Sequence, residues 1–297
     1  MLDPSSKKDI EKVSLEILRS SKSLDVFPTP IEKIAAYSEL IVRKDIDVSV
    51  VHDDYLFKAT DALKRALSKV RGMFDRKEKT IFLDLSLKKE RRNFVQLHEI
   101  AHGVLPWQTN IHDLLDDDDD SLNDHTYEEF EIEANYFASI TLFQHDRFID
   151  ELNKYSLSIE SSIQLAKHFG ASVHASLRKY IECSKNRCAL IVLENITKKG
   201  TFPKCNIKDK FQSEKFNETF GELIIPNELG YKWIFVQDYY HQRRFKTDGL
   251  ISIDTCNGIA DFNYHFFNNT YNAFVFLFPI GEKKSSRKRI IITDTNL

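Results

Sequence analysis

The sequence predicts an α+β protein in which helices dominate the first part of the chain and strands the last part. Up to about residue 185, apolar residues recur mainly at the spacings of helices that are buried on one side. From Cys188 onward, short apolar runs bounded by turn residues are typical of strands. A chain of 297 residues also suits two domains. We therefore expect a mainly helical domain with a small β-sheet over residues 1–155, a helical connector over 156–184 and a C-terminal α+β domain over 185–297.

Composition and charge are those of an ordinary globular protein and leave most functions open. Hydrophobic residues make up 42% of the chain, and the net charge of −3 gives no overall positive field for nucleic acid. No segment has about 18 consecutive apolar residues, and the first residues form no apolar signal stretch, so we expect a cytoplasmic protein without a membrane partner. The cysteines form no C-x-x-C pair and are expected to be free thiols; they are Cys183, Cys188, Cys205 and Cys256.

The elements predicted before residue 90 are helices, a strand and a hairpin. Residues 7–20 place their apolar side chains on one side of a helix. Residues 30–70 are expected to add two helices and a strand around residues 40–42. Residues 72–85 alternate and turn like a β-hairpin with its bend at 75–78.

Residues 98–102 read His-Glu-Ile-Ala-His and are the most informative part of the sequence. On a helix, His98 and His102 project from one face a turn apart, so both imidazoles can bind one metal ion. Glu99 can then reach a water at that metal. The alternative is a pair of buried histidines bonded to backbone carbonyls, in a turn whose glutamate also needs partners. The helix is expected to end at Pro106, and its apolar stripe consists of Phe94, Leu97, Ala101 and Val104.

A third protein ligand is expected, because catalytic zinc usually has three protein ligands and one water. The helix predicted around residues 128–138 offers two acidic candidates on opposite edges of its apolar stripe. Glu131 is preferred because Asn135 follows four residues later on the same edge and can hydrogen-bond a zinc-binding histidine from behind. Glu133 is the alternative ligand, and a solvated acidic helix face is the alternative without a metal.

Two linked stretches of the chain resemble the ImmA/IrrE metallopeptidases. Residues 92–103 contain an Arg-x-Phe lead-in followed by H-E-x-x-H, and residues 131–138 read Glu-Ile-Glu-Ala-Asn-Tyr-Phe-Ala. The resemblance covers about residues 25–185. It implies a zincin-like fold of the gluzincin kind, Zn²⁺ as cofactor and proteolysis of a protein substrate inside bacterial cells. The typical substrate in that family is a DNA-binding helix-turn-helix repressor encoded nearby, in a stress, DNA-damage or phage-related setting.

The functional hypothesis is therefore a zinc-dependent endopeptidase. His98, His102 and Glu131 would hold zinc, while Glu99 takes a proton from the attacking water and returns it to the leaving amine. A strand over residues 81–85 is expected to hold an extended substrate by backbone pairing at the edge of the sheet. The acidic run 116–120 is interpreted either as a solvated loop or as a lid that attracts a basic repressor.

Residues 157–181 have the outline of a helix-turn-helix, with Gly170 in the turn. Its second helix offers few cations, namely Arg178 and Lys179, so a packing connector is preferred to a DNA reader. The alternative function from another class is a DNA-binding transcriptional regulator that uses this segment and retains a structural or vestigial metal site.

The C-terminal domain is expected to be sensory or regulatory, and its place in the chain weakly resembles that of a GAF-like domain in some ImmA/IrrE proteins. Its predicted strands are residues 189–193, 221–226, 233–236, 274–278 and 290–292, with one helix near 209–220. A basic cluster between the last two strands suggests a phosphate-bearing effector such as single-stranded DNA, with a solvated hairpin tip as the alternative. The cluster consists of Lys283, Lys284, Arg287, Lys288 and Arg289.

Overall fold

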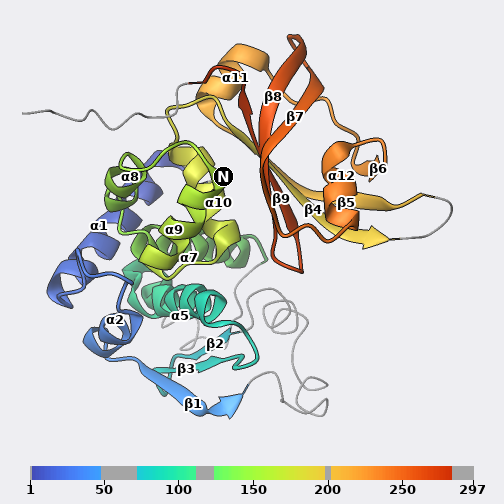
Figure 1. Cartoon of the computed structure of the whole chain (residues 1–297). Helices are drawn as coiled ribbons and strands as arrows, with labels where there is room; N and C mark the ends of the chain where they lie inside the picture. Colours follow the sequence, from blue (N-terminus) through green and yellow to red (C-terminus); the bar gives the residue numbers. More distant parts are fainter. Residues whose placement is uncertain (1, 48–71, 112–123, 198–201, 283–297) are drawn as a thin grey trace, which may run out of the picture. The chain divides into compact units, whose positions relative to one another are not determined.

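The chain forms two compact units, each with its own sheet (Figure 1). The computed structural model describes residues 2–47, 72–111, 124–197 and 202–282. The first unit comprises Met1–Phe148 and Ala166–Ser172, and the second comprises Ile149–Leu165 and Val173–Leu297. The predicted α+β class is confirmed, because helices prevail up to residue 183 and strands prevail after it. The predicted division into a domain, a connector and a second domain stays a prediction.

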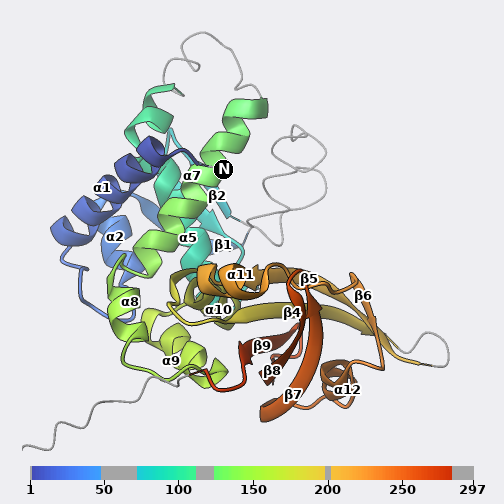
Figure 2. The ribbon, with the colours of Figure 1, turned by 90° about the horizontal axis from the view of Figure 1, so that it is seen from above.

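In the first unit, a central helix lies between another helix and a small sheet. α5 contacts α7 on one side and β2 and β3 on the other, as Figures 1 and 2 show. Residues 95–101 of α5 are all buried, so this helix forms the middle of the unit. The elements of the unit are α1 (Pro4–Ser20), α2 (Ile31–Tyr37), β1 (Ile41–Asp47), β2 (Gly72–Asp75), β3 (Thr80–Leu83), α5 (Lys89–Val104) and α7 (Asp124–Leu142).

The helix predicted over residues 7–20 is present as α1, which begins at Pro4, where a proline is well tolerated in a first turn. Asp3 caps it by accepting hydrogen bonds from the backbone nitrogens of Ser5 and Ser6. The predicted hairpin is also present as β2 and β3, with its bend at residues 76–79. The second helix expected before residue 70 lies outside the described residues.

α5 ends at Val104, as the following proline predicts. Leu105 has extended backbone angles (φ −76°, ψ 110°), which is the conformation favoured for a residue that precedes proline. A new helical segment begins at Pro106 and is described as far as residue 111. Because the chain changes direction at Leu105, the residues after it can return to α5.

The sheet of the first unit has the strand order β1-β3-β2. β1 pairs with β3 in parallel and β2 pairs with β3 in antiparallel orientation. The expectation that residues 81–85 form an edge strand is therefore wrong, since β3 is central. Among the described strands, β2 is the edge strand that contacts α5. The sequence pattern could not reveal this arrangement, because the pairing of β1 with β3 joins segments about 40 residues apart.

The second unit is built on a six-stranded antiparallel sheet of order β6-β5-β4-β9-β8-β7. Its strands are β4 (Ala189–Thr197), β5 (Lys204–Gln212), β6 (Glu228–Gly230), β7 (Phe245–Thr255), β8 (Gly258–Asn268) and β9 (Ala273–Pro279), and its helices include α10 (Val173–Cys183), α11 (Glu214–Phe220) and α12 (Ile234–Tyr240). α8 (Arg147–Leu152) and α9 (Ile159–Phe169) each cross a boundary between the units. No helix in the described part of the chain is long and apolar enough to span a membrane.

Both faces of the middle of this sheet are covered. One face packs on a cluster that includes Phe216 of α11 and Phe235 of α12. On the other face, Tyr180 of α10 lies edge-on to Phe276 with ring centroids 5.6 Å apart. A strand buried on both faces reads as a continuous apolar run, which is why residues 189–193 and 274–278 were recognisable as strands.

Two predictions for the second unit are wrong. Residues 233–236 belong to helix α12 and its N-cap rather than to a strand, because Phe235, Val236 and Tyr239 are buried on one helical face. A four-residue apolar run does not distinguish the two structures. Residues 221–226 form only an isolated bridge between Leu223 and Thr255. The predicted helix near 209–220 is shorter, since α11 begins at Glu214 after β5.

Candidate metal centre

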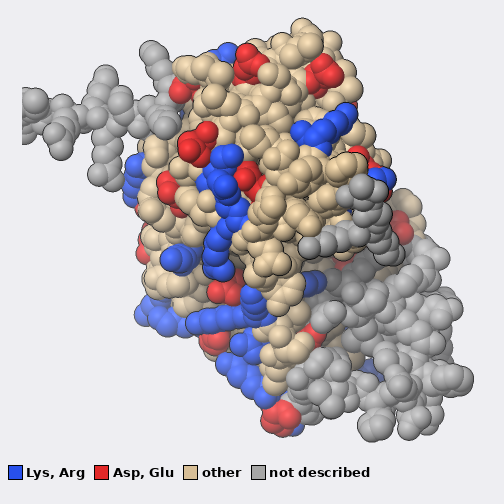
Figure 3. Space-filling view, turned by 45° about the vertical axis from the view of Figure 1, so that its right-hand side comes forward, with Lys and Arg blue, Asp and Glu red and all other residues tan. Residues whose placement is uncertain are grey.

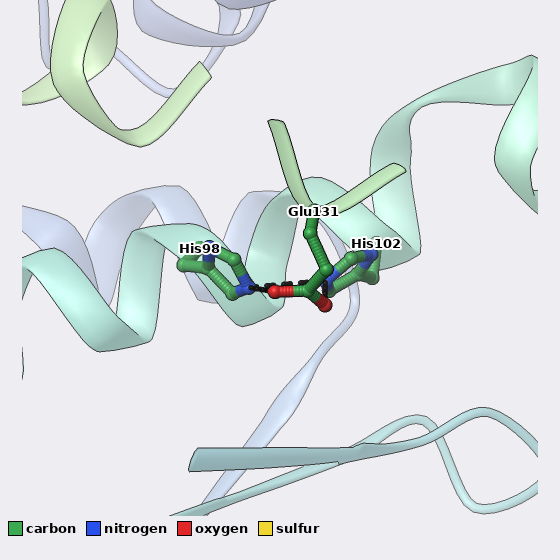
Figure 4. Close-up of side chains that lie close together, drawn as sticks. All are labelled: His98, His102 and Glu131. Carbon is green, nitrogen blue, oxygen red and sulfur yellow. Dashed lines mark hydrogen bonds and ion pairs between the residues drawn. The ribbon is translucent and has the colours of Figure 1, made fainter. Parts of the chain in front are cut away.

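The three predicted ligands meet in the first unit, where α5 and α7 face each other (Figure 4). His98 and His102 lie one turn apart on α5, and Glu131 reaches them from α7. The side chain of His98 is 1% exposed, that of His102 13% and that of Glu131 21%. The cluster is therefore closed at His98 and accessible to solvent at Glu131.

The distances between the ligand atoms suit a tetrahedral metal ion. The two Nε2 atoms of His98 and His102 lie 3.2 Å apart. Glu131 Oε2 lies 3.4 Å from Nε2 of His98, and Glu131 Oε1 lies 3.5 Å from Nε2 of His102. Ligand atoms at about 2.0–2.1 Å from zinc in tetrahedral positions are about 3.3 Å from one another. The residues present therefore fit zinc, with two nitrogens, one carboxylate and a fourth position left for water or substrate.

The charge of Glu131 is also appropriate for a ligand. Burial alone would raise the pKa of this carboxyl group, but hydrogen bonds and charge interactions with His102 and His98 hold it well below its ordinary value. The carboxylate form that binds metal ions is therefore favoured by the same two histidines.

Glu99 lies on α5 between the two histidines and is 5% exposed. Burial raises its pKa to about 7, and Glu131 adds to the shift while His102 opposes it. Its carboxylate lies against the first residue of β2, since a Cβ atom added to Gly72 would be 2.6 Å from Glu99 Oε1. The absence of a side chain at Gly72 thus makes room for Glu99 beside the edge strand.

Three further residues form a hydrogen-bonded group on the Nδ1 side of the His102 ring. Gln108 Oε1 lies 2.9 Å from Nδ1 of His102, and Gln108 Nε2 donates to Glu133 Oε2 at 2.7 Å. Trp107 Nε1 donates to the same Glu133 oxygen at 2.7 Å. In this arrangement Glu133 holds Gln108 and not the metal cluster. The sequence reasoning missed Trp107 and Gln108, although the break at Pro106 was a signal that the chain returns towards α5.

Asn135 does not take the position predicted for it. Its side chain is exposed, and Nδ2 donates to the backbone carbonyl of Glu131 at 2.8 Å rather than to a histidine. An asparagine four residues after a helical residue can reach that residue's carbonyl, and this local bond is the one it makes.

The other predicted functional segments are less informative. The run 116–120 and the basic cluster Lys283, Lys284, Arg287, Lys288 and Arg289 lie outside the described residues. In α10, the two cations expected for DNA contact are both near Glu182: Arg178 Nε donates to it at 2.8 Å, and Lys179 lies 4.0 Å from it. On the face drawn in Figure 3, basic side chains are interspersed with acidic ones.

Comparison with known proteins identifies the segment that carries this centre. Residues 57–179 match the peptidase M78 family model, described as the IrrE N-terminal-like domain. The peptidases of that family are metal-dependent. No curated protein matches the chain in sequence. Among solved structures, a Mycobacterium tuberculosis transcriptional regulator is 14% identical and has a TM-score of 0.51, with 91% of this chain and 75% of that chain covered. At this identity the likeness concerns the fold alone.

Proposed function

Because residues 57–179 match the model of the IrrE-like peptidases, we propose that the chain is a zinc-dependent endopeptidase that cleaves a helix-turn-helix repressor. The observation that carries the proposal is that the metal-binding atoms of His98, His102 and Glu131 lie close enough together to bind one ion, with Glu99 beside them. Zinc is chosen because two imidazoles and one carboxylate at these spacings are the donor set of a catalytic zinc site.

When bound, zinc would polarise the scissile carbonyl and acidify a water molecule. Within the chain, His98, His102 and Glu131 hold the ion, and the buried part of α5 keeps bulk water away from His98. The Glu99 carboxylate takes the proton of the attacking water and later gives it to the leaving amine. Its place between the ligands and Gly72 puts this proton transfer next to β2.

The substrate would bind as an extended strand along β2. β2 is an edge strand among the described strands, and its first residue adjoins Glu99. A peptide that pairs with the side of β2 away from β3 would therefore pass close to the proposed base. This role replaces the one predicted for residues 81–85.

A repressor is proposed as the substrate because the chain resembles the ImmA/IrrE proteins, whose typical targets are repressors. A cytoplasmic location and a trigger from stress, DNA damage or phage infection follow from the same resemblance. The C-terminal domain, residues 185–297, would be the GAF-like sensor of that trigger. Single-stranded DNA or another phosphate-bearing effector would bind it through the basic cluster at residues 283–289, which the structure does not describe.

The alternative function is a DNA-binding regulator that uses residues 157–181. It is less favoured because α10, the candidate recognition helix, buries Leu177, Tyr180 and Ile181. Arg178 and Lys179 are also close to an acidic neighbour on the same helix, so they offer little free positive charge to phosphates.

The test begins with bound zinc, measured by elemental analysis. We expect one zinc per chain in the wild type and in Glu128→Gln, an exposed control on α7, and little or none in His98→Ala and Glu131→Gln. Glu99→Gln should keep its zinc but cleave its repressor substrate about 10²- to 10⁴-fold more slowly. Zinc retained in both ligand variants would overturn the metal site, and cleavage at the wild-type rate by Glu99→Gln would remove Glu99 from the chemistry.

A further inference from the structure

We propose that Gln108, oriented by Glu133, is a positioning residue that fixes the tautomer of His102 so that its Nε2 lone pair faces the metal. The inference rests on the proposed zinc function. It concerns a hydrogen-bonded chain that runs from Glu133 through Gln108 to His102, away from the face on which the ligands meet.

The position of Gln108 follows from the break after α5. Leu105 is extended, and the backbone nitrogen of Gln108 donates to the Leu105 carbonyl at 3.0 Å. This turn brings the Gln108 side chain under the last turn of α5, where it is fully buried. A buried amide needs partners for both its oxygen and its nitrogen, so its contacts here are not incidental.

The orientation of the Gln108 amide is determined by its acceptors. Nε2 lies 3.3 Å from the backbone carbonyl of Phe130 and 2.7 Å from Glu133 Oε2. A carbonyl oxygen only accepts hydrogen bonds, and Glu133 Oε2 also accepts from Trp107 Nε1. The side of the amide that faces Phe130 and Glu133 must therefore be the NH₂ group, and the oxygen must face His102.

The tautomer of His102 follows from that orientation. Gln108 Oε1 has no hydrogen to give, so Nδ1 of His102, at 2.9 Å, must carry the proton. In the neutral ring, Nε2 is then unprotonated, and it is Nε2 that points at His98 and Glu131. By contrast, Nδ1 of His98 has no hydrogen-bond partner among the described residues. Of the two histidines, His102 is thus the one whose tautomer is determined by a hydrogen bond to another side chain.

The first experiment measures the tautomer directly, without metal or activity. In the metal-free wild type at about pH 8, above the ordinary imidazole pKa, ¹⁵N spectra of the histidine rings should show His102 protonated at Nδ1. Gln108→Met, which keeps the volume but removes the amide, should lose this signature. A wild-type His102 whose Nδ1 carries no proton would overturn the proposal, even if no variant folds.

The second experiment measures zinc affinity in competition with a coloured chelator. Gln108→Met should bind zinc about 10- to 100-fold more weakly, as expected when a group that orients a ligand is removed. The matched control is Gln144→Leu, which removes another fully buried glutamine of the same unit. Its amide bonds Thr29, Val26, Ser23 and Asp25, so its loss should lower stability but leave the His102 tautomer and zinc affinity unchanged. Unchanged affinity and tautomer in Gln108→Met would refute the inference.

A paired exchange distinguishes positioning from simple packing. Glu133→Gln alone should weaken zinc, because an amide at position 133 lets Gln108 flip its nitrogen towards His102. Adding Gln108→Glu places a carboxylate against Nδ1 of His102 and lets the amide at position 133 donate to it, so the double variant should recover the tautomer. It should be less stable than the wild type, because a carboxylate oxygen replaces the amide group that donates to the Phe130 carbonyl. Failure of the double variant to recover the tautomer would count against positioning. If the wild type shows the predicted tautomer but binds no zinc, the proposed function fails while the hydrogen-bonded chain stands.

Discussion

Gly72 shows how the absence of one side chain can determine the position of the proposed base. A Cβ at this position would lie 2.6 Å from Glu99 Oε1 and 2.7 Å from Val95 Cγ1, distances at which something must move. The backbone of β2 and the carboxylate of Glu99 can be neighbours only because the side chain is absent. Glycine here serves a close approach between a strand and a helix.

Gly72→Ala should keep zinc but lose activity. Crowding displaces either β2 or Glu99, and a misplacement of about 1 Å can reduce the cleavage rate about 10²-fold. Overpacking should also lower the free energy of unfolding by about 1–3 kcal/mol. Zinc content, repressor cleavage and urea unfolding measure these effects. The control is Gly230→Ala, where an added Cβ meets no atom within 4 Å. Wild-type cleavage and stability in Gly72→Ala would show that the missing side chain at position 72 is not needed to accommodate Glu99.

The sequence predicted the residues of the candidate metal centre better than the groups around them. One turn of helix places His98 beside His102, whereas periodicity alone left Glu131 and Glu133 as alternatives, and the packing of α7 on α5 brings Glu131 to the histidines. The contact of Gln108 with His102 depends on the direction the chain takes after Leu105, and that of Gly72 with Glu99 on packing between elements. Asn135 was misplaced because its local bond to the Glu131 carbonyl competes with any longer reach.

At the scale of elements, the sequence predicted the helices and strands whose apolar residues recur at a regular spacing or in a continuous run. It missed those whose apolar pattern is weak or short. α1, α5, β4 and β9 were predicted, because each has an apolar stripe or a continuous apolar run. β5 was missed because Asp209 interrupts the alternating apolar residues Cys205, Ile207 and Phe211, and α12 was mistaken for a strand because its apolar run is short. The central place of β3 depends on pairing with a distant strand, which no local pattern encodes.

The start of α11 offers a test of how an element is held in the second unit. Ser213 Oγ accepts from the backbone nitrogens of Phe216 and Cys188 at 3.2 Å each and donates to the Asn186 carbonyl at 2.8 Å. It thus caps α11 and ties the helix to the beginning of β4.

Ser213→Ala should lower the free energy of unfolding of the second unit by about 1–2 kcal/mol, because the cap is lost and buried backbone groups lose a partner. Urea unfolding followed by the fluorescence of Trp233 measures the effect. Ser252→Ala removes an exposed hydroxyl that bonds only Asp261 in the described part of the chain and should stay within about 0.5 kcal/mol of the wild type. A Ser213→Ala variant as stable as this control would show that the cap contributes little.

At the scale of the whole molecule, the two tryptophans fall one in each unit. Trp107 lies next to the metal centre through its bond to Glu133, and Trp233 lies at the start of α12. Each tryptophan can therefore report on its own unit in a variant that lacks the other. The ligand atoms of the proposed zinc site all belong to the first unit.

Zinc should consequently stabilise the first unit more than the second. In Trp233→Phe, zinc should raise the temperature of the unfolding transition seen by Trp107. The free energy of unfolding of the first unit should rise by about 2.7 kcal/mol when free zinc is a hundred times its dissociation constant. In Trp107→Phe, which loses a hydrogen bond to Glu133, free zinc is set to a hundred times the dissociation constant of that variant, and the transition seen by Trp233 should shift much less. Equal shifts in the two variants would mean that the units unfold together. The absence of a shift in both variants would contradict a zinc site in the first unit.

The shortness of β2 has a consequence for what the enzyme could cut. Four residues span only about 13 Å of extended chain, so a substrate paired along β2 must offer a stretch of similar length free of its own secondary structure. A folded repressor presents such a stretch at a linker, or elsewhere only during local opening. When opening is fast compared with cleavage, the rate follows the open fraction of the target. The lifetime of a repressor would then be set partly by its own stability, and a substitution that stiffens it far from the cleaved bond would protect it.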